Sequence, residues 1–115
     1  MKIYNVKPNG NENAEYVGTD YLKFSLSMIE DDIDWLKKTK DVAQSLLANI
    51  ELLLLISERY RVDANLLIKK DQVTKWQEVF NKWYERVNKR IPDEFREGIR
   101  KSAEELFAEL EQYGH

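Results

Sequence analysis

The sequence contains no cysteine and only one histidine, which stands at position 115. Without cysteine the chain can form no disulfide, no thiolate metal site and no cysteine nucleophile. With His115 as its single imidazole, it also lacks the Glu-x-x-His pairs of helical di-iron sites, and Ser-His-Asp hydrolysis is excluded on the same ground. Several large classes of enzyme and metal protein are therefore ruled out.

Glycine and proline are also scarce, with 4 and 2 residues respectively. The glycines are too scattered to form a phosphate-binding loop. The longest apolar run, residues 52–56, is far shorter than the roughly 20 residues that cross a bilayer. The first residues also lack the charged-then-apolar pattern of a signal peptide. We therefore expect a cytoplasmic protein with no membrane partner.

Charged and apolar residues make up most of the chain. Of its 115 residues, 43% are hydrophobic and 34% are charged, and the formal net charge is −3. A chain of this length is expected to fold as one domain with a modest core. The near balance of charges gives no whole-chain signature of nucleic-acid binding.

The leucine-rich stretch at residues 41–60 predicts a central helix. It contains no glycine or proline, and Asp41 with Gln44 can form a capping box at its start. Its apolar residues form two neighbouring stripes at helical spacing, which requires at least two packing partners. Leu52 and Leu55 fall on the remaining face, which should be polar. Either further helices or another subunit must cover them.

Residues 20–38 predict an earlier helix, which Thr19 or Asp20 can cap. Its apolar residues continue in phase into residues 41–60, so the two segments could be one long helix. The polar run at residues 37–41 favours a break instead. One stripe of the earlier helix should pack into the core, and a second stripe lies beside it. The first stripe contains Leu22, Leu26, Ile29, Ile33 and Leu36, and the second contains Tyr21, Phe24, Met28 and Trp35.

Two more helices are predicted in the second half of the chain, over residues 71–89, with 64 as an alternative start, and over residues 92–113. Trp76 and Trp83 belong to the apolar stripe of the first and should be core. Pro92 separates the two helices. In the last helix we expect Gly98 to mark a close helix crossing. We expect its buried residues to be Phe95, Ile99, Ala103, Leu106 and Leu110.

Together these segments predict an all-α protein, an antiparallel bundle of three to four helices. Residues 1–18 differ in composition from the rest, holding one of the two prolines and two of the four glycines. We expect them to form an arm, extended or partly disordered, and residues 19–115 to form the bundle domain. The alternative for the arm is a hairpin with strands at residues 2–6 and 15–17.

An acidic run at residues 30–34 is a candidate for metal chemistry. Glu30 and Asp34 share one helix face with Asp31 adjacent, and paired carboxylates can hold Mg²⁺. The run resembles the acidic motif of the all-α nucleotide pyrophosphohydrolases, which would imply a Mg²⁺-dependent enzyme. The second acidic helix motif of that family has no match downstream. We therefore expect no metal or cofactor and keep this enzyme as the second alternative.

Charge is distributed unevenly, since residues 59–90 carry 9 basic and 4 acidic side chains whereas residues 91–115 carry 3 and 7. A basic row within residues 69–90 could contact a phosphate backbone. Glu78 and Glu85 interrupt this row and form helix-stabilising pairs within it, each contributing about 0.2–0.5 kcal/mol. Nucleic-acid binding is therefore only the first alternative function. The row consists of Lys75, Lys82, Arg86 and Lys89.

The remaining observation is an excess of apolar helix surface. Phe24, Trp35, Leu52 and Leu55 lie where a four-helix monomer has little to cover them. We therefore predict a small non-enzymatic protein that binds proteins through apolar helix faces, as an adaptor, regulator or inhibitor. We expect a homodimer, and the composition is typical of viral or mobile-element regulatory proteins.

Overall fold

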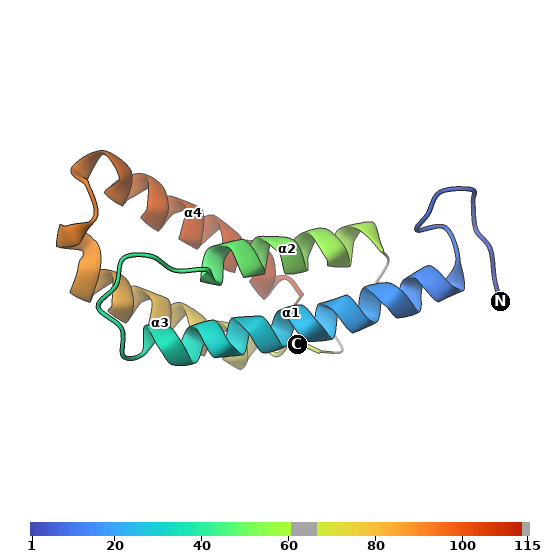
Figure 1. The fold of residues 1–115 in the computed structure, drawn as a ribbon, viewed down its shortest axis with the longest axis horizontal. Helices are drawn as coiled ribbons and strands as arrows, with labels where there is room; N and C mark the ends of the chain where they lie inside the picture. The colour runs from blue at the N-terminus through green and yellow to red at the C-terminus, as the bar shows by residue number, and fades with distance from the viewer. Residues whose placement is uncertain (61–66, 114–115) are drawn as a thin grey trace.

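The structure is a computed structural model of the 115-residue chain, and it describes residues 1–60 and 67–113. The described residues form four α-helices and no β-strand, which confirms the all-α bundle predicted from the sequence. The helices are α1 (Glu12–Leu36), α2 (Leu46–Arg59), α3 (Lys70–Val87) and α4 (Asp93–Glu111), with a 3-10 turn, η2 (Asn88–Arg90), between the last two (Figure 1).

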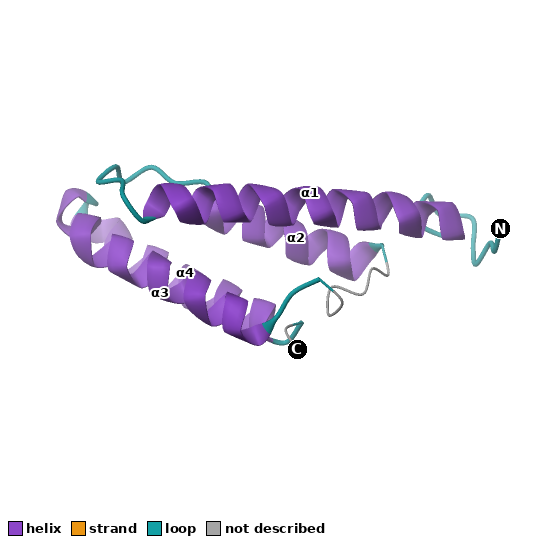
Figure 2. Cartoon of the chain, turned by 90° about the horizontal axis from the view of Figure 1, so that it is seen from below, coloured by secondary structure: helices purple, strands orange, loops and turns teal. Residues whose placement is uncertain are grey.

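The helices are arranged in two layers. α1 packs on α2 and α3, and α4 packs on the same two helices. Figure 2 shows α1 and α2 in one layer and α3 and α4 in the other. Consecutive helices run in opposite directions (Figure 1). The molecule is elongated, with extents of 53 × 27 × 20 Å, because the first turns of α1 extend beyond the other layer (Figure 2).

The core is a cluster of buried side chains between the layers. Trp76 and Trp83 belong to it, as the sequence predicted. The Phe80 ring centre lies 5.3 Å from that of Trp83 and 6.0 Å from that of Phe107, so α3 and α4 meet through aromatic contacts. Each large apolar side chain that is fully buried stabilises the fold by about 1.5–3 kcal/mol.

α1 begins at Glu12, earlier than the predicted start at residue 20. Its N-cap is Asn11, whose side chain accepts a hydrogen bond of 2.9 Å from the Ala14 amide. Thr19 is not a cap, because its hydroxyl donates to the Glu15 carbonyl one turn earlier within the helix. Glycine inside a helix costs only about 1 kcal/mol, so Gly18 does not stop a helix with so good a cap.

The N-terminal arm is correspondingly short, covering residues 1–11 and not 1–18. The hairpin alternative is wrong as well, because residues 15–17 lie in α1. The arm folds back in a tight turn in which the Tyr4 and Asn5 amides donate to the Gly10 carbonyl. A Cβ at position 10 would lie 2.7 Å from the Asn5 main-chain carbonyl oxygen, which cannot turn aside as a side chain can, so the turn requires glycine. The Asn9 side chain donates to the Arg59 carbonyl at 2.6 Å and ties the arm to the end of α2.

α1 and α2 are separate helices, which confirms the favoured break and rules out one long helix over residues 20–60. The predicted start of α2 at Asp41 is wrong, because the helix begins at Leu46. Asp41 accepts from the Ala43 amide in a local turn, and its carbonyl accepts from the Trp83 indole at 2.9 Å. The Gln44 side chain accepts a hydrogen bond from the Leu47 amide in the first turn of α2.

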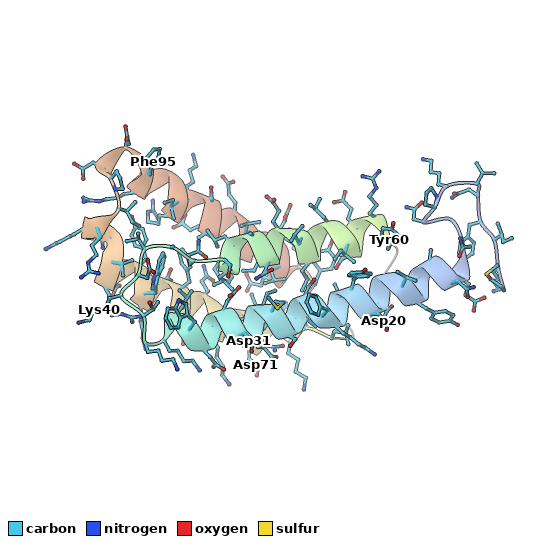
Figure 3. The ribbon with its side chains drawn as sticks, in the orientation of Figure 1. Asp20, Asp31, Lys40, Tyr60, Asp71 and Phe95 are labelled. Atoms are coloured by element: carbon cyan, nitrogen blue, oxygen red, sulfur yellow. The ribbon has the colours of Figure 1, made fainter. Side chains whose placement is uncertain are left out.

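In the second half, α3 and α4 lie within one or two residues of the predicted bounds. The alternative start at residue 64 lies outside the described residues. The expected burial of Phe95 is wrong, since it is 55% exposed, and Phe107 is buried in its place. Figure 3 shows Phe95 at the end of α4 that projects away from α2, where nothing covers it. Gly98 marks no close crossing, because a Cβ there would meet no heavy atom within 4 Å.

Candidate protein-binding surface

α1 carries two apolar stripes on different sides of the helix. The stripe that includes Leu22 and Ile29 is sealed in the core. The second stripe points outward, and in it Phe24 is 62% and Trp35 is 51% exposed. The spacing of four, three, four and seven residues keeps the second stripe on one side of the helix. Its members are Val17, Tyr21, Phe24, Met28 and Trp35.

α2 adds two more exposed side chains, Leu52 at 52% and Leu55 at 51%. The Asp32 carboxylate of α1 accepts hydrogen bonds of 2.6 Å from both Ser45 and Asn49 and so fixes how α2 lies on α1. Leu52 follows Asn49 by one turn and therefore lies on the side of α2 nearest α1, while Leu55 points outward. We call the exposed apolar side chains of both helices the outer apolar face. It consists of Val17, Tyr21, Phe24, Met28, Trp35, Leu52 and Leu55.

A small pocket opens at one end of the outer apolar face. It has a volume of about 180 Å³ and lies between the N-terminal half of α1 and the C-terminal end of α2. Gly18 contributes no side chain, which leaves room between the two helices. The pocket can therefore accept one apolar side chain from a partner. It is lined by Val17, Gly18, Tyr21, Ile56 and Tyr60.

Charged side chains edge the outer apolar face on α1. Asp20 and Asp31 are exposed along one side of the helix (Figure 3), and Lys38 is exposed in the turn that follows it. Within the described residues, none of the three forms an ion pair.

Tyr16, also on α1, interacts with an acidic side chain one turn earlier. Its hydroxyl donates to Glu12, and this hydrogen bond, together with the Glu12 charge, raises the pKa of Tyr16.

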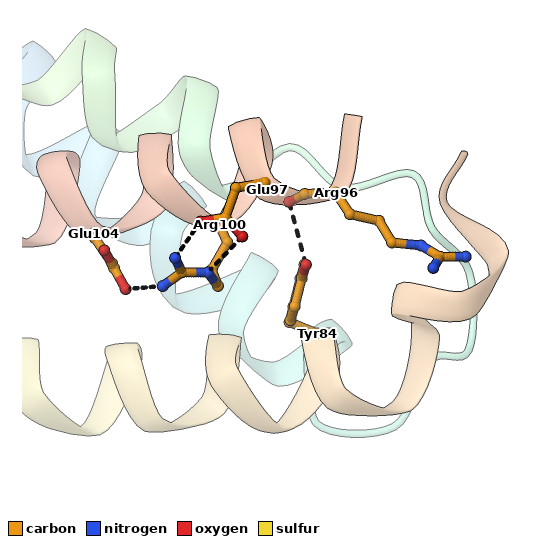
Figure 4. A network of polar contacts seen from close by, with 5 residues as sticks. All are labelled: Tyr84, Arg96, Glu97, Arg100 and Glu104. Atoms are coloured by element: carbon orange, nitrogen blue, oxygen red, sulfur yellow. Dashed lines mark hydrogen bonds and ion pairs between the residues drawn. The ribbon is translucent and has the colours of Figure 1, made fainter. Parts of the chain in front are cut away.

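The α3–α4 layer presents a different surface to solvent. Arg100 pairs with both Glu97 and Glu104 along α4, and the Tyr84 hydroxyl donates to the Arg96 carbonyl at 3.2 Å (Figure 4). The hydrogen bond from Arg100 and its charge lower the pKa of Glu97. On α4, charged side chains therefore pair with each other along the helix.

The predicted basic row stays on one side of α3 and the turn after it, but one of its members makes contacts within the fold. The Arg86 guanidinium donates to the Leu36 and Thr39 carbonyls, where it caps the end of α1, whose last turn has no basic residue of its own. Arg90 donates in the same way to the Lys40 carbonyl at 2.9 Å. Exposed lysines remain on α3, but Glu78 and Glu85 alternate with them. All four members of the row are exposed, and of these Arg86 is engaged with main-chain carbonyls. The four are Lys75, Lys82, Arg86 and Lys89.

Three carboxylates of the acidic run of α1 make contacts within the fold. Asp32 holds α2, Glu30 accepts from the Gln72 side chain of α3 at 3.2 Å, and Asp34 lies 3.6 Å from the Lys37 ammonium. Asp31 remains exposed at the edge of the outer apolar face. In the part of the chain that the structure describes, no group of acidic or histidine side chains is close enough to hold a metal ion.

Sequence reasoning found most of the outer apolar face but missed one end of it. Phe24, Trp35, Leu52 and Leu55 were predicted, and Tyr21 and Met28 were placed in the second stripe. Val17 and the pocket were missed because residues 1–18 were assigned to the arm. The four-residue spacing from Val17 to Tyr21 is the signal that extends the stripe.

Comparison with known proteins adds no functional information. No family model matches the chain, and neither a curated protein nor a solved structure matches it. The described helices also include none that combines the length and apolar character needed to cross a bilayer.

Proposed function

We propose that this protein acts by binding another protein chain through the outer apolar face. In this proposal it is a small non-enzymatic adaptor, regulator or inhibitor that works in the cytoplasm. The observation that supports the proposal is the set of half-exposed apolar side chains on α1 and α2, with a pocket between the two helices at one end of it. Contiguous apolar patches of this kind mark interaction sites on soluble proteins.

The chemistry of the face favours tight contact. Tyr21 and Trp35 are residue types that dominate the binding energy of protein interfaces when a partner buries them. Both project from one regular helix, so binding requires little ordering of the backbone. The pocket beside Tyr21 gives a partner side chain a defined position, and the charged edge with Asp20 and Asp31 limits which partners fit.

Selection from a phage-displayed library of amphipathic helical peptides tests the proposal. We expect the selected peptides to lose at least about tenfold in affinity for the Phe24→Glu or the Leu52→Glu variant, since each places a charge in the contact. Both side chains are exposed, so the variants should keep the helical circular dichroism of the wild type.

The matched control is Phe95→Glu, which places the same charge at an exposed aromatic residue on α4. Peptides that bind the outer apolar face should bind this control as they bind the wild type. Peptides that bind all three variants equally well would show that the face is not the binding site and would refute the proposal.

A further inference from the structure

We infer that the partner of the outer apolar face is a second copy of this chain, with the two α1 helices antiparallel about a two-fold axis that crosses the outer side of α1 at the level of residue 29. This inference rests on the proposed function and names its partner. It is carried by the area of the face, by the distribution of apolar residues between α1 and α2, and by the charges at the ends of α1.

The area of the face suits a dimer of modest stability. Aromatic side chains carry about 150–250 Å² each, and the seven residues of the face are one-third to two-thirds exposed, so together they present on the order of 600 Å². A typical stable interface buries about 800 Å² on each partner. Residues at the rim, such as Asp20 and Lys38, supply the difference. An antiparallel pair centred at residue 29 sets residues 22–36 of the two α1 helices against each other, a contact about 22 Å long. Val17 and Tyr21 then face the turn that follows α1 of the other copy.

The apolar residues favour contact between the two α1 helices. Five of the seven residues of the face, including all three aromatic ones, lie on α1. A two-fold axis that sets α1 against its counterpart therefore pairs the richer stripe with itself. Docking α1 on the partner copy's α2 would instead set those five side chains against Leu52 and Leu55 alone.

The charges favour the antiparallel direction. Asp20 and Lys38 lie nine residues on either side of Ile29. An antiparallel pair centred at Ile29 therefore brings Asp20 of each copy to Lys38 of the other. Asp31 then lies opposite Ser27, which carries no charge. A parallel pair would place Asp20, Asp31 and Lys38 each beside its own copy, and like charges in contact are unfavourable.

The absence of cysteine from the chain makes the arrangement directly testable. We expect sedimentation equilibrium at micromolar concentration to show a dimer that Phe24→Glu converts to a folded monomer. In a mixture of the single variants Asp20→Cys and Lys38→Cys, a short bifunctional thiol reagent should link the two different chains. Lys101→Cys, exposed on α4, is the control and should give no linked dimer.

A charge exchange provides a second measurement that does not depend on cysteine. Asp20→Lys alone should weaken the dimer roughly fivefold, because each of the two symmetric contacts then sets lysine against lysine. The double variant Asp20→Lys/Lys38→Asp should restore the wild-type dissociation constant. A merely structural role for Asp20 would give no such restoration.

The outcomes separate this inference from the proposed function. A monomeric wild type that still binds the selected peptides through the outer apolar face would overturn the dimer and leave the proposed function in place. Linkage of Asp20→Cys to itself would overturn the antiparallel direction, and linkage to an Arg59→Cys variant would show α1 docked on the partner copy's α2. A dimer that Phe24→Glu does not dissociate would place the contact elsewhere.

Discussion

The α1–α2 layer and the α3–α4 layer share one core but meet the solvent with different surfaces. On α4, ion pairs such as Arg100 with Glu97 and Glu104 satisfy charged side chains within the helix (Figure 4). On α1 and α2, the corresponding surface is the outer apolar face. On their inner sides, both layers contribute fully buried apolar side chains to the core.

This difference shows that the fold does not account for the outer apolar face. The core is complete without Trp35 or Leu52, and a charged surface like that of α4 would serve the bundle equally well. Side chains that the fold does not require, and that water disfavours, are those that the proposed partner would cover. The following predictions test how far the two surfaces differ.

The largest expected effect separates two neighbours on α2. Leu53 is 0% exposed, so Leu53→Glu buries an unpaired carboxylate and should cost more than about 4 kcal/mol. Leu52→Glu should change the free energy of unfolding of the monomer by less than about 0.5 kcal/mol. Urea unfolding followed by circular dichroism measures both. If Leu52→Glu also unfolds the protein, Leu52 contributes to the stability of the monomer. The outer apolar face would then be part of the packing of the fold.

The next effect separates two phenylalanines of α4. Phe107→Ala removes a ring that packs on Phe80 in the core, and it should destabilise the protein by about 3–5 kcal/mol. Phe95→Ala removes an exposed ring, and the free energy of unfolding should change by no more than about 0.5 kcal/mol. Thermal unfolding of the two variants side by side checks this. Equal losses would mean that the first turn of α4 is covered in solution.

A smaller effect is expected where α3 holds the end of α1. Arg86→Gln leaves the Leu36 and Thr39 carbonyls without their donor and should cost about 1–2 kcal/mol. Lys82→Gln removes an exposed charge from the same helix, and its effect should stay within about 0.5 kcal/mol. Urea midpoints of the two variants give the difference. Identical midpoints would mean that the Arg86 contacts add no stability. Its guanidinium could then bind phosphate, which would favour the nucleic-acid alternative.

The smallest effect concerns the ionic surface itself. The pKa of Glu97 is lowered by Arg100, so the pair adds stability above the unfolded-state pKa of the carboxyl and loses it as pH falls through the folded-state pKa. The melting temperature of Glu97→Gln should therefore lie slightly below that of the wild type at neutral pH and converge with it in acid. Glu105→Gln, on the same helix but outside these ion pairs, should show no such convergence.

The sequence alone predicted the class of the fold and most of the outer apolar face. Helical spacing identified the buried stripe with Leu22 and Ile29, and it placed Leu52 and Leu55 on the side of α2 that stays exposed. These predictions succeeded because each depends on a repeat within one helix, which a single sequence displays.

The errors have a different origin, since they depend on contacts between distant parts of the chain. Hydrogen bonds from Trp83 and Arg86 of α3 hold the bend before α2. Asp41 therefore lies in a turn and does not cap a helix. Phe95 fits the buried stripe of α4 by spacing, but no helix extends far enough to cover it. The start of α1 is an exception, because it depends on the local cap at Asn11, and the sequence analysis assigned residues 1–18 to the arm on composition alone.

The bend between α1 and α2 also has a consequence for the order of folding. The side chains that hold it stand some distance along the chain, 42 residues from Asp41 to Trp83 and 50 from Leu36 to Arg86. During synthesis, α1 and α2 leave the ribosome before Trp83 and Arg86 emerge from it, while the apolar repeats of the two helices are in phase. We therefore expect the nascent segment to sample a straight rod, and the turn between α1 and α2 to gain the contacts from Trp83 and Arg86 only when α3 arrives.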